Sequence, residues 1–348
     1  MDLLLYQLLR SCYKPQIAFL DGLVFGLGAS IALNCPIRIA TNSSIFQAAS
    51  QEEACTNYTI NPGLFYSLSN LDDNLGPFLA LTGYKVKGKD LWHAGLSTIY
   101  MPYERLSSLE LHLHNLVNYD SSSLRQLLLS VCSDPGFFSL KAYLPIINRC
   151  FGGSSVEDII ESLKQDNSSF SQTCVERILS YPPLFIKLTH KLLQTCAGHS
   201  PIDCLRIAHL LNQNKKKILT NFSPPTTLKE VSRELLESLV PADPADYSSV
   251  DFLKERVPQT SLKREEWELW DVARHYNGKL DILPGKTAFF QNWGDFEGVI
   301  TRKNVEETLK SLTHQTLFEL EKRFYKKVCF PKNKEKLSQL FTSLLKTE

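Results

Sequence analysis

Residues 16–41 carry the pattern that most restricts how this chain can fold. The run QIAFLDG at 16–22 is apolar and ends at Asp-Gly, so it predicts a buried strand that enters a turn. LVFGLGASIALNC follows, and its glycines at 26 and 28 predict a loop with exposed backbone NH groups that opens a tightly packed helix. IRIAT at 37–41 predicts a second strand. Strand, turn, helix and strand in this order form a right-handed crossover unit, which indicates an α/β fold.

The next segments are predominantly helical in pattern. LGPFLALTG predicts a helix that ends at Gly83, a residue suited to the left-handed position after a helix. Asp90 is expected near the start of a further helix, where its charge suits the helix dipole. Residues 103–195 repeat Leu and Ile at helical spacing, and within them Ser154 or Ser155 is expected to cap a helix that has acids in its first turn.

Composition excludes several classes of protein. The 348 residues are 43% hydrophobic and 22% charged with a net charge of +1, which is typical of a globular protein with a substantial core. No apolar run reaches the roughly 18 residues of a membrane span, so we expect no membrane insertion. The N-terminal stretch MDLLLYQLLRSCYKP carries an acid and indicates an amphipathic core helix rather than a secretory signal. The nine cysteines are scattered and include no CxxC pair, so we predict neither disulfides nor a zinc site.

Two pairs of segments resemble a known family. QIAFLDGLVFGLGASIALNCPIRIAT and LGPFLALTGYKVKGKDLWHAGLST resemble the crotonase superfamily and, within it, the 3-hydroxyisobutyryl-CoA hydrolases. VEDIIESLKQDNSSF and YPPLFIKLTHKLL resemble the helical C-terminal region of those hydrolases. The resemblance covers roughly residues 5–211 and implies a spiral ββα core. DFEGVITRK at 295–303 is faintly similar to a later segment of the family, which would make residues 216–294 a large insertion.

The resemblance, together with the change to breaker-rich sequence after NQNKKK at 212–217, implies three regions. Residues 1–100 would form a partial crotonase-like core, residues 101–215 the helical region, and residues 216–348 an extension that is mostly helical and ends in a basic tail. The strands that open the family's core have no counterpart here. Because their absence would expose a sheet edge, we expect either that a partner chain covers it or that the true start of the chain lies further upstream.

The family's catalytic motif has a glutamate, an aspartate eight residues later, and then a glycine. Aligned on NPG, the glutamate corresponds to Glu53, with Glu52 adjacent, and the aspartate corresponds to Asn61. The family's second oxyanion NH comes from the middle of three glycines, and these positions are here Gly26, Leu27 and Gly28. Gly26 and Gly28 would flank the substrate, and the Leu27 side chain is expected to crowd the acyl group. Ser30 replaces an extra glutamate of the hydratases, which disfavours hydratase chemistry.

Thioester hydrolysis needs an oxyanion hole and a carboxylate that attacks or activates water. Glu53 can supply the carboxylate, either as an active nucleophile or base or as a vestige. Asn61 can donate and accept hydrogen bonds, but it carries no charge and cannot take a proton as a carboxylate does. Since losing one of two acting carboxylates costs orders of magnitude in rate, we expect a retired active site without a cofactor. A CoA thioester would be a substrate only if the site is active.

Other candidate residues have simpler interpretations. His112 and His114 lie two apart on a helical segment, face different directions, and are expected at the surface rather than on a metal. His93 beside Trp92 is expected to pack within a helix. KKK at 215–217 is expected to be a solvated helix end or linker rather than a phosphate contact. The C-terminal tail interleaves aromatic residues with a dense set of cations, and both RNA contact and a soluble amphipathic helix remain open for it. These cations include Lys322, Arg323, Lys326, Lys327, Lys332, Lys334 and Lys336.

Three functions of different classes follow. The leading hypothesis is a non-catalytic structural subunit of the mitochondrial ribosome's small subunit, bound to mitochondrial ribosomal proteins and rRNA, because relatives of the hydrolase serve there. The second is an active 3-hydroxyisobutyryl-CoA hydrolase of valine breakdown. The third is a crotonase-like scaffold outside the ribosome. The resemblance implies location in the mitochondrial matrix.

Overall fold

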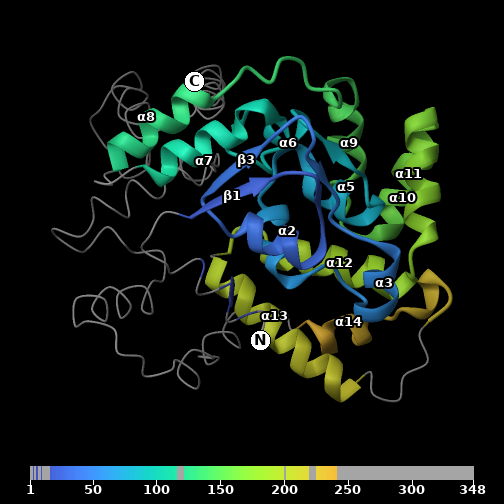
Figure 1. Ribbon diagram of the computed structural model, residues 1–348. Helices are drawn as coiled ribbons and strands as arrows, with labels where there is room; N and C mark the ends of the chain where they lie inside the picture. Colours follow the sequence, from blue (N-terminus) through green and yellow to red (C-terminus); the bar gives the residue numbers. More distant parts are fainter. Residues whose placement is uncertain are drawn as a thin grey trace, which may run out of the picture.

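The computed structural model describes residues 16–115, 121–199, 201–218 and 225–240, together with Leu3, Leu5, Tyr6 and Leu9. Its centre is the predicted crossover unit, in which β1 (Ile17–Leu20) leads through α2 (Gly26–Leu33) to β3 (Ile37–Ala40). β1 and β3 are parallel, with Ile17 opposite Ile37, and β6 (Ile99–Tyr100) continues the sheet in parallel on the far side of β3. Figure 1 shows these strands next to α2. The predicted strand–helix–strand unit is confirmed.

A second small sheet was not predicted. β2 (Leu23–Val24) lies within the stretch expected to be a loop, and it pairs in parallel with β4 (Ile45–Phe46). β5 (Val86–Lys87) pairs antiparallel with β4. Strands of two residues leave almost no periodicity in a sequence, so their pairing depends on the surrounding fold rather than on local pattern.

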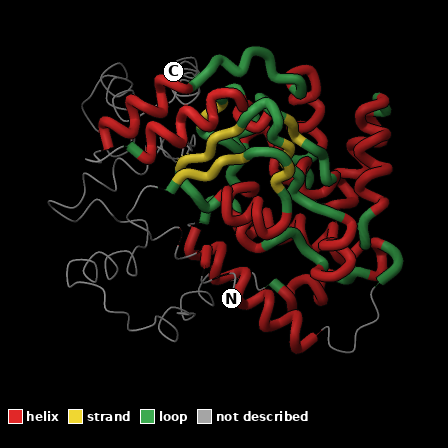
Figure 2. The backbone as a smooth tube through the Cα atoms, in the orientation of Figure 1, coloured by secondary structure: helices red, strands yellow, loops and turns green. Residues whose placement is uncertain are grey.

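Helices cover the sheets on both sides. In Figure 2 the strands form a small central part of the molecule, surrounded by helices. The described helices after α2 are α3 (Gln51–Asn57), α4 (Phe65–Ser69), α5 (Leu75–Thr82), α6 (Asp90–His93), α7 (Leu106–His114), α8 (Ser121–Val131), α9 (Leu144–Cys150), α10 (Val156–Asp166), α11 (Ser169–Ser180), α12 (Pro183–Cys196), α13 (Pro201–Ile218) and α14 (Arg233–Leu239). Short 3₁₀ turns occupy Pro62–Leu64, Asp72–Asn74, Tyr103–Arg105, Lys141–Tyr143 and Leu228–Glu230.

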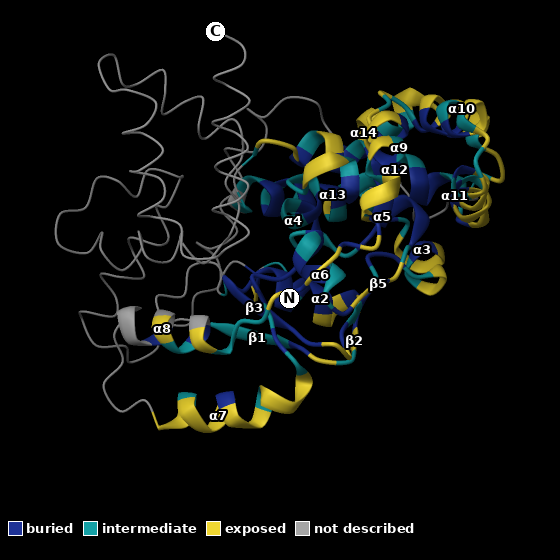
Figure 3. Cartoon of the chain, turned by 90° about the horizontal axis from the view of Figure 1, so that it is seen from above, coloured by how far each residue is buried: buried dark blue, intermediate teal, exposed yellow. Residues whose placement is uncertain are grey.

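The sheet separates two apolar clusters. One face of β3 presents Ile37 and Ile39 to a cluster that Leu109 of α7 and Leu124 and Leu128 of α8 complete. Ala40 and Leu20 belong to the larger cluster on the other side. All four residues of β3 are buried, as expected for a parallel strand that is covered on both faces. Figure 3 shows α7 with a mostly exposed outer surface at one side of the molecule.

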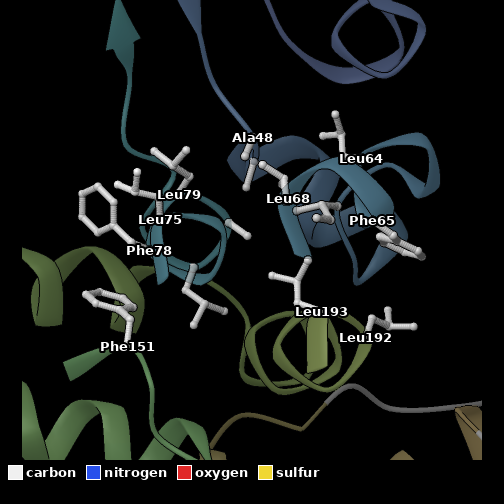
Figure 4. Packing of buried hydrophobic residues seen from close by; sticks show 14 of the residues in the cluster. Ala48, Leu64, Phe65, Leu68, Leu75, Phe78, Leu79, Phe151, Leu192 and Leu193 are labelled. Atoms are coloured by element: carbon white, nitrogen blue, oxygen red, sulfur yellow. The ribbon is translucent and has the colours of Figure 1, made fainter. Parts of the chain in front are cut away.

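α5 is the hub of the larger cluster. Leu75, Phe78 and Leu79 project from it, and Phe78 meets Phe151 edge to face with ring centroids 5.4 Å apart (Figure 4). Leu192 and Leu193 approach from α12. α5 also lies against α4 so closely that a Cβ added at Gly76 would be 1.8 Å from the carbonyl oxygen of Leu68. Glycine at this position therefore permits the packing of the two helices.

The predicted helix ends are confirmed. Gly83 follows α5 in the left-handed conformation, with φ of +58°. Asp90 begins α6. Of the two candidate N-caps of α10, Ser154 and Ser155, it is Ser155 that caps the helix, and it forms a reciprocal capping box with Asp158. Tyr6 is fully buried and helical, in agreement with a core helix at the N-terminus.

The predicted boundary near residue 215 falls inside α13, which continues to Ile218. α14 then packs against both α12 and α13, and Leu239 and Val240 are buried in the larger cluster. Residues 225–240 therefore pack on the same core as the helices before them. Among the described residues, no helix is both long and apolar enough to cross a membrane.

Candidate functional site

Glu53 lies in the first turn of α3, and the structure distinguishes it from its neighbour Glu52. Ser50 caps the helix: its Oγ accepts a hydrogen bond from the Glu53 backbone NH at 3.2 Å and donates to Glu53 Oε2 at 3.4 Å. Glu52 is exposed, whereas Glu53 is partly buried. Burial raises the pKa of the Glu53 carboxyl; hydrogen bonds with Ser50 oppose this rise and the charge of Glu52 adds to it. Glu53 is therefore the carboxylate that faces the protein interior.

The Glu53 carboxylate lies against the start of α2. Oε1 is 3.0 Å from the position that a Cβ on Gly26 would occupy, and Gly26 has a left-handed φ of +55°. The backbone NH groups of Gly26, Leu27 and Gly28 lie in the first turn of α2, where no carbonyl one turn earlier in the helix can accept from them. The predicted glutamate and the predicted oxyanion loop are thus brought to one corner of the fold.

The Leu27 side chain points outward. It remains 46% exposed, and Leu23 and Phe25 on the same stretch are 57% and 47% exposed. An apolar rim therefore surrounds the first turn of α2.

Asn61 has a structural position in the site. Its Oδ1 accepts from the Tyr6 hydroxyl at 2.8 Å and from the Gly63 backbone NH at 3.2 Å, so the side chain caps the turn Pro62–Leu64. Among the hydrogen bonds of the described residues, none joins Glu53 to Asn61. The two residues lie near different parts of α2: Glu53 is next to its first residue, and Asn61 is next to Gly63, which packs on Ser30.

Ser30 lies in a closely packed interior. Its side chain is fully buried, and its Oγ has no hydrogen-bond partner among the described residues. A Cβ on Gly63 would be 2.7 Å from the Cβ of Ser30 and 2.9 Å from Cζ of Tyr6. Asn34 joins the same contact, since its Nδ2 donates to the Gly63 carbonyl at 2.9 Å. The position where hydratases of the superfamily carry a glutamate is here occupied by a small side chain against this packed turn.

Helices from the second half of the chain hold α3 in place, which local pattern did not predict. Tyr181 donates its hydroxyl to the carbonyl of Ala49 at 3.2 Å, and Gln51 Nε2 donates to Ser180 Oγ at 3.0 Å. Burial raises the pKa of the Tyr181 hydroxyl, and Glu53 is one of the charges that act on it. The two contacts fix the start of α3, which carries Glu53.

A lysine holds the other end of α3. Lys215 Nζ donates to the carbonyl of Asn57 at 2.5 Å, and burial lowers the pKa of this amine to about 7. Lys215 lies in the last turn of α13, so the expected helix end is confirmed for this residue. Its amine is not simply solvated, because it ties α13 to α3.

The remaining candidates lie away from this corner. His112 and His114 are exposed on α7, as expected, and the His112 ring bonds to the Ser108 carbonyl oxygen at 2.6 Å. His93 packs as predicted, with its ring stacked on Phe138 at a centroid distance of 5.1 Å. The basic tail from Lys322 to Lys336 and the predicted insertion beyond residue 240 lie outside the described residues.

The chain is similar in sequence to two known hydrolases. The 3-hydroxyisobutyryl-CoA hydrolase, mitochondrial, of Homo sapiens is 30% identical over 208 residues, which are 58% of this chain and 53% of that protein. The protein of the same name from Mus musculus is 32% identical over 217 residues, or 61% of this chain and 56% of that one. The chain therefore spans about half the length of these relatives.

Solved structures show the same fold. A carnitinyl-CoA dehydratase from Mycobacterium thermoresistibile superposes with a TM-score of 0.58 at 21% identity, over 69% of this chain and 72% of that one. An enoyl-CoA hydratase from Rhodobacter sphaeroides superposes with a TM-score of 0.56 at 18% identity, over the same shares. The predicted crotonase fold is thus confirmed. Residues 3–222 match the family model described as enoyl-CoA hydratase/isomerase, and the chain belongs to this family, with similarity to its 3-hydroxyisobutyryl-CoA hydrolases.

Proposed function

We propose that this chain is a non-catalytic member of its family and serves as a structural component of the small subunit of the mitochondrial ribosome. The main support for a loss of catalysis is the identity and the hydrogen bonding of Asn61. It stands where the resemblance places a carboxylate, and its amide oxygen is committed to Tyr6 and Gly63. An amide in this arrangement keeps the turn Pro62–Leu64 capped but cannot exchange a proton with a substrate or with water.

Two further features support the structural role. The relatives described above carry "mitochondrial" in their names, which supports the same compartment for this chain. The sequence of the tail, with seven cations and three aromatic residues between 322 and 336, has the composition that suits contact with RNA phosphates and bases. A protein that keeps a stable fold and adds such a tail is suited to assembly into a ribonucleoprotein.

A second candidate function is 3-hydroxyisobutyryl-CoA hydrolysis, and the pair Glu53–Gly26 favours it. The carboxylate is held beside the first turn of α2, whose NH groups suit an oxyanion, and burial raises the Glu53 pKa toward the working range of a general base. In this alternative, Glu53 alone supplies the acting carboxylate and Asn61 orients the substrate hydroxyl.

Two measurements separate these functions, the first on the endogenous protein and the second on the purified full-length chain and its variants. The first is sedimentation of mitochondrial lysate through a gradient, with and without low magnesium to dissociate the ribosomal subunits. Co-migration with the small subunit in both conditions is the expected result. Migration as a small species contradicts the ribosomal role, and migration in a complex of another size points to a scaffold outside the ribosome.

The second measurement is hydrolysis of 3-hydroxyisobutyryl-CoA by the purified full chain. We expect no turnover above that of Glu53→Gln. The adjacent acid provides the matched control, because Glu52→Gln removes an exposed carboxylate from the same turn of α3. Turnover that Glu53→Gln abolishes and Glu52→Gln preserves establishes the hydrolase instead.

A further inference from the structure

A groove lies between α5, α11 and the turn Lys141–Tyr143, with a volume of about 310 Å³. None of the residues Gly26, Leu27, Glu53 or Asn61 lines it. Its size is at the lower end of the range for small-molecule sites, which is about 300–1,000 Å³. The groove is therefore separate from the corner that holds Glu53 and large enough for a small organic ligand.

Aromatic rings form one end and the floor of the groove. Tyr143 and Phe170 stack with centroids 4.3 Å apart, and Phe78 lies 5.8 Å from Phe170 and 5.2 Å from Tyr84. Phe78 is fully buried, so the floor is fixed by the core of the molecule. The Tyr143 ring remains 39% exposed, so the stacked pair presents an aromatic surface at this end of the groove, against which a further ring can stack.

One face of α11 forms the other wall and carries a cation. Ser169, Thr173 and Arg177 follow at intervals of four residues, so they lie along one side of the helix over about 12 Å. The Arg177 guanidinium carbon is 5.6 Å from the centre of the Tyr84 ring. Among the ion pairs of the described residues, Arg177 takes part in none, and its side chain is exposed at the mouth of the groove.

Cys174 also lines the groove but is not a reactive group there. Burial raises the pKa of its thiol to about 12, so it remains protonated and contributes an apolar surface. The Thr173 hydroxyl donates to the Ser169 carbonyl at 2.9 Å, which leaves its oxygen available only as an acceptor. Arg177 is thus the group on this wall that can pair with an anion.

We propose that the groove binds a small aromatic monocarboxylate, with the ring against the stacked pair Tyr143–Phe170 and the carboxylate on Arg177. The Cα atoms of Phe170 and Arg177 lie about 10 Å apart along α11, and the long arginine side chain covers part of this distance, so the remaining span suits a phenyl ring joined to a carboxylate by a short linker. The guanidinium fork fits a carboxylate in a bidentate manner. This site is additional to the function proposed above and does not depend on it.

The test is titration of the full chain with 3-phenylpropionate by calorimetry and ligand-observed NMR. We expect saturable binding that Arg177→Gln weakens by about tenfold, as for a partly solvated charged hydrogen bond. Arg105→Gln, which changes an exposed arginine whose contact is with Ser133, is the matched control and leaves binding unchanged. Thr173→Phe places a ring in the groove and abolishes binding.

A change of ligand tests the same contact without a change of protein. 3-Phenylpropionamide lacks the charge, so it binds the unmodified chain about tenfold more weakly and binds Arg177→Gln with no additional loss. Octanoate tests the aromatic part, and we expect it to bind more weakly than 3-phenylpropionate. Absence of saturable binding, equal binding of acid and amide, or equal binding by octanoate overturns the proposal.

Discussion

Oε1 of Glu53 lies 3.0 Å from the point that a Cβ on Gly26 would occupy, so the carboxylate covers the residue that begins α2. Gly26 also has a positive φ, which a residue with a side chain adopts at a cost. Position 26 is therefore restricted twice, by its own backbone and by the carboxylate from α3. The backbone conformation at Gly26 and the position of the Glu53 carboxylate therefore depend on each other.

Gly26→Ala is expected to lower the free energy of unfolding by about 1–2 kcal/mol, since left-handed backbone is costly for alanine. The new methyl group also displaces the Glu53 carboxylate. Urea denaturation measures the loss. Gly28→Ala is the matched control, because a Cβ there meets nothing within 4 Å and φ is not positive. It should raise stability by about 0.5–1 kcal/mol, as alanine is a better helix residue. Equal effects of the two changes would contradict the restriction at position 26.

Asn61→Asp is expected to preserve the fold and restore thioester hydrolysis. Both groups that bond Oδ1, the Tyr6 hydroxyl and the Gly63 NH, are donors, so a carboxylate can accept the same hydrogen bonds. We expect the 3-hydroxyisobutyryl-CoA turnover of Asn61→Asp to exceed that of Asn61→Asp with Glu53→Gln by about 10²-fold or more, the usual contribution of a general acid or base. A steady-state assay of the single variant beside Asn61→Asp with Glu53→Gln measures it. If Asn61→Asp stays inactive while its melting temperature is unchanged, a feature of the site other than Asn61 prevents hydrolysis.

The features that the sequence predicted are those encoded over short distances. The crossover unit depends on two apolar runs and the glycines between them, and the ends of α5 and α10 depend on Gly83 and Ser155. The tie between Tyr6 and Asn61 spans 55 residues and the tie between Lys215 and Asn57 spans 158. Such contacts leave no local pattern, because they exist only after the helices have packed.

The candidate site shows the same division. The spacing of the motif identified Glu53 and Asn61 as the candidate site residues. Only the structure shows that the Glu53 carboxylate lies against Gly26, whereas the Asn61 side chain caps the turn Pro62–Leu64. The Tyr181 hydroxyl bonds to the backbone just before α3, and no sequence motif around Tyr181 predicted this contact. The predicted roles of Glu53 and Leu27 in chemistry stay predictions, and the hydrolysis assays above test that of Glu53.

Gly76→Ala is expected to cost about 3 kcal/mol of stability, at the upper end of the usual range for overpacking. The new Cβ would be 1.8 Å from the Leu68 carbonyl oxygen, and a backbone atom cannot move aside as a flexible side chain can. α4 and α5 must therefore separate, which also disturbs the contacts of Phe78 and Leu79 (Figure 4). Equilibrium unfolding measures the loss. A loss of less than about 1 kcal/mol would show that the two helices are less closely packed.

His190 is expected to make stability fall on mild acidification. The ring on α12 is 5% exposed, and burial lowers its pKa. A hydrogen bond with the Gly153 backbone and the charges of Asp158 and Glu157 oppose this shift, while Lys191 adds to it. Since the folded-state pKa lies below the unfolded value of 6.5, the fold favours the neutral ring. Its contribution is present in full above pH 6.5 and declines as pH falls through that value toward the folded-state pKa.

The measurement is the free energy of unfolding between about pH 7.5 and about pH 5 for the unmodified chain and for His190→Gln. The variant loses packing at every pH, but it lacks the titrating ring, so its stability falls less steeply. The difference between the two proteins should therefore shrink as pH is lowered. His114→Gln, on the exposed side of α7, controls for the loss of one imidazole. A difference that stays constant or widens on acidification would show that His190 does not favour its neutral form in the folded chain.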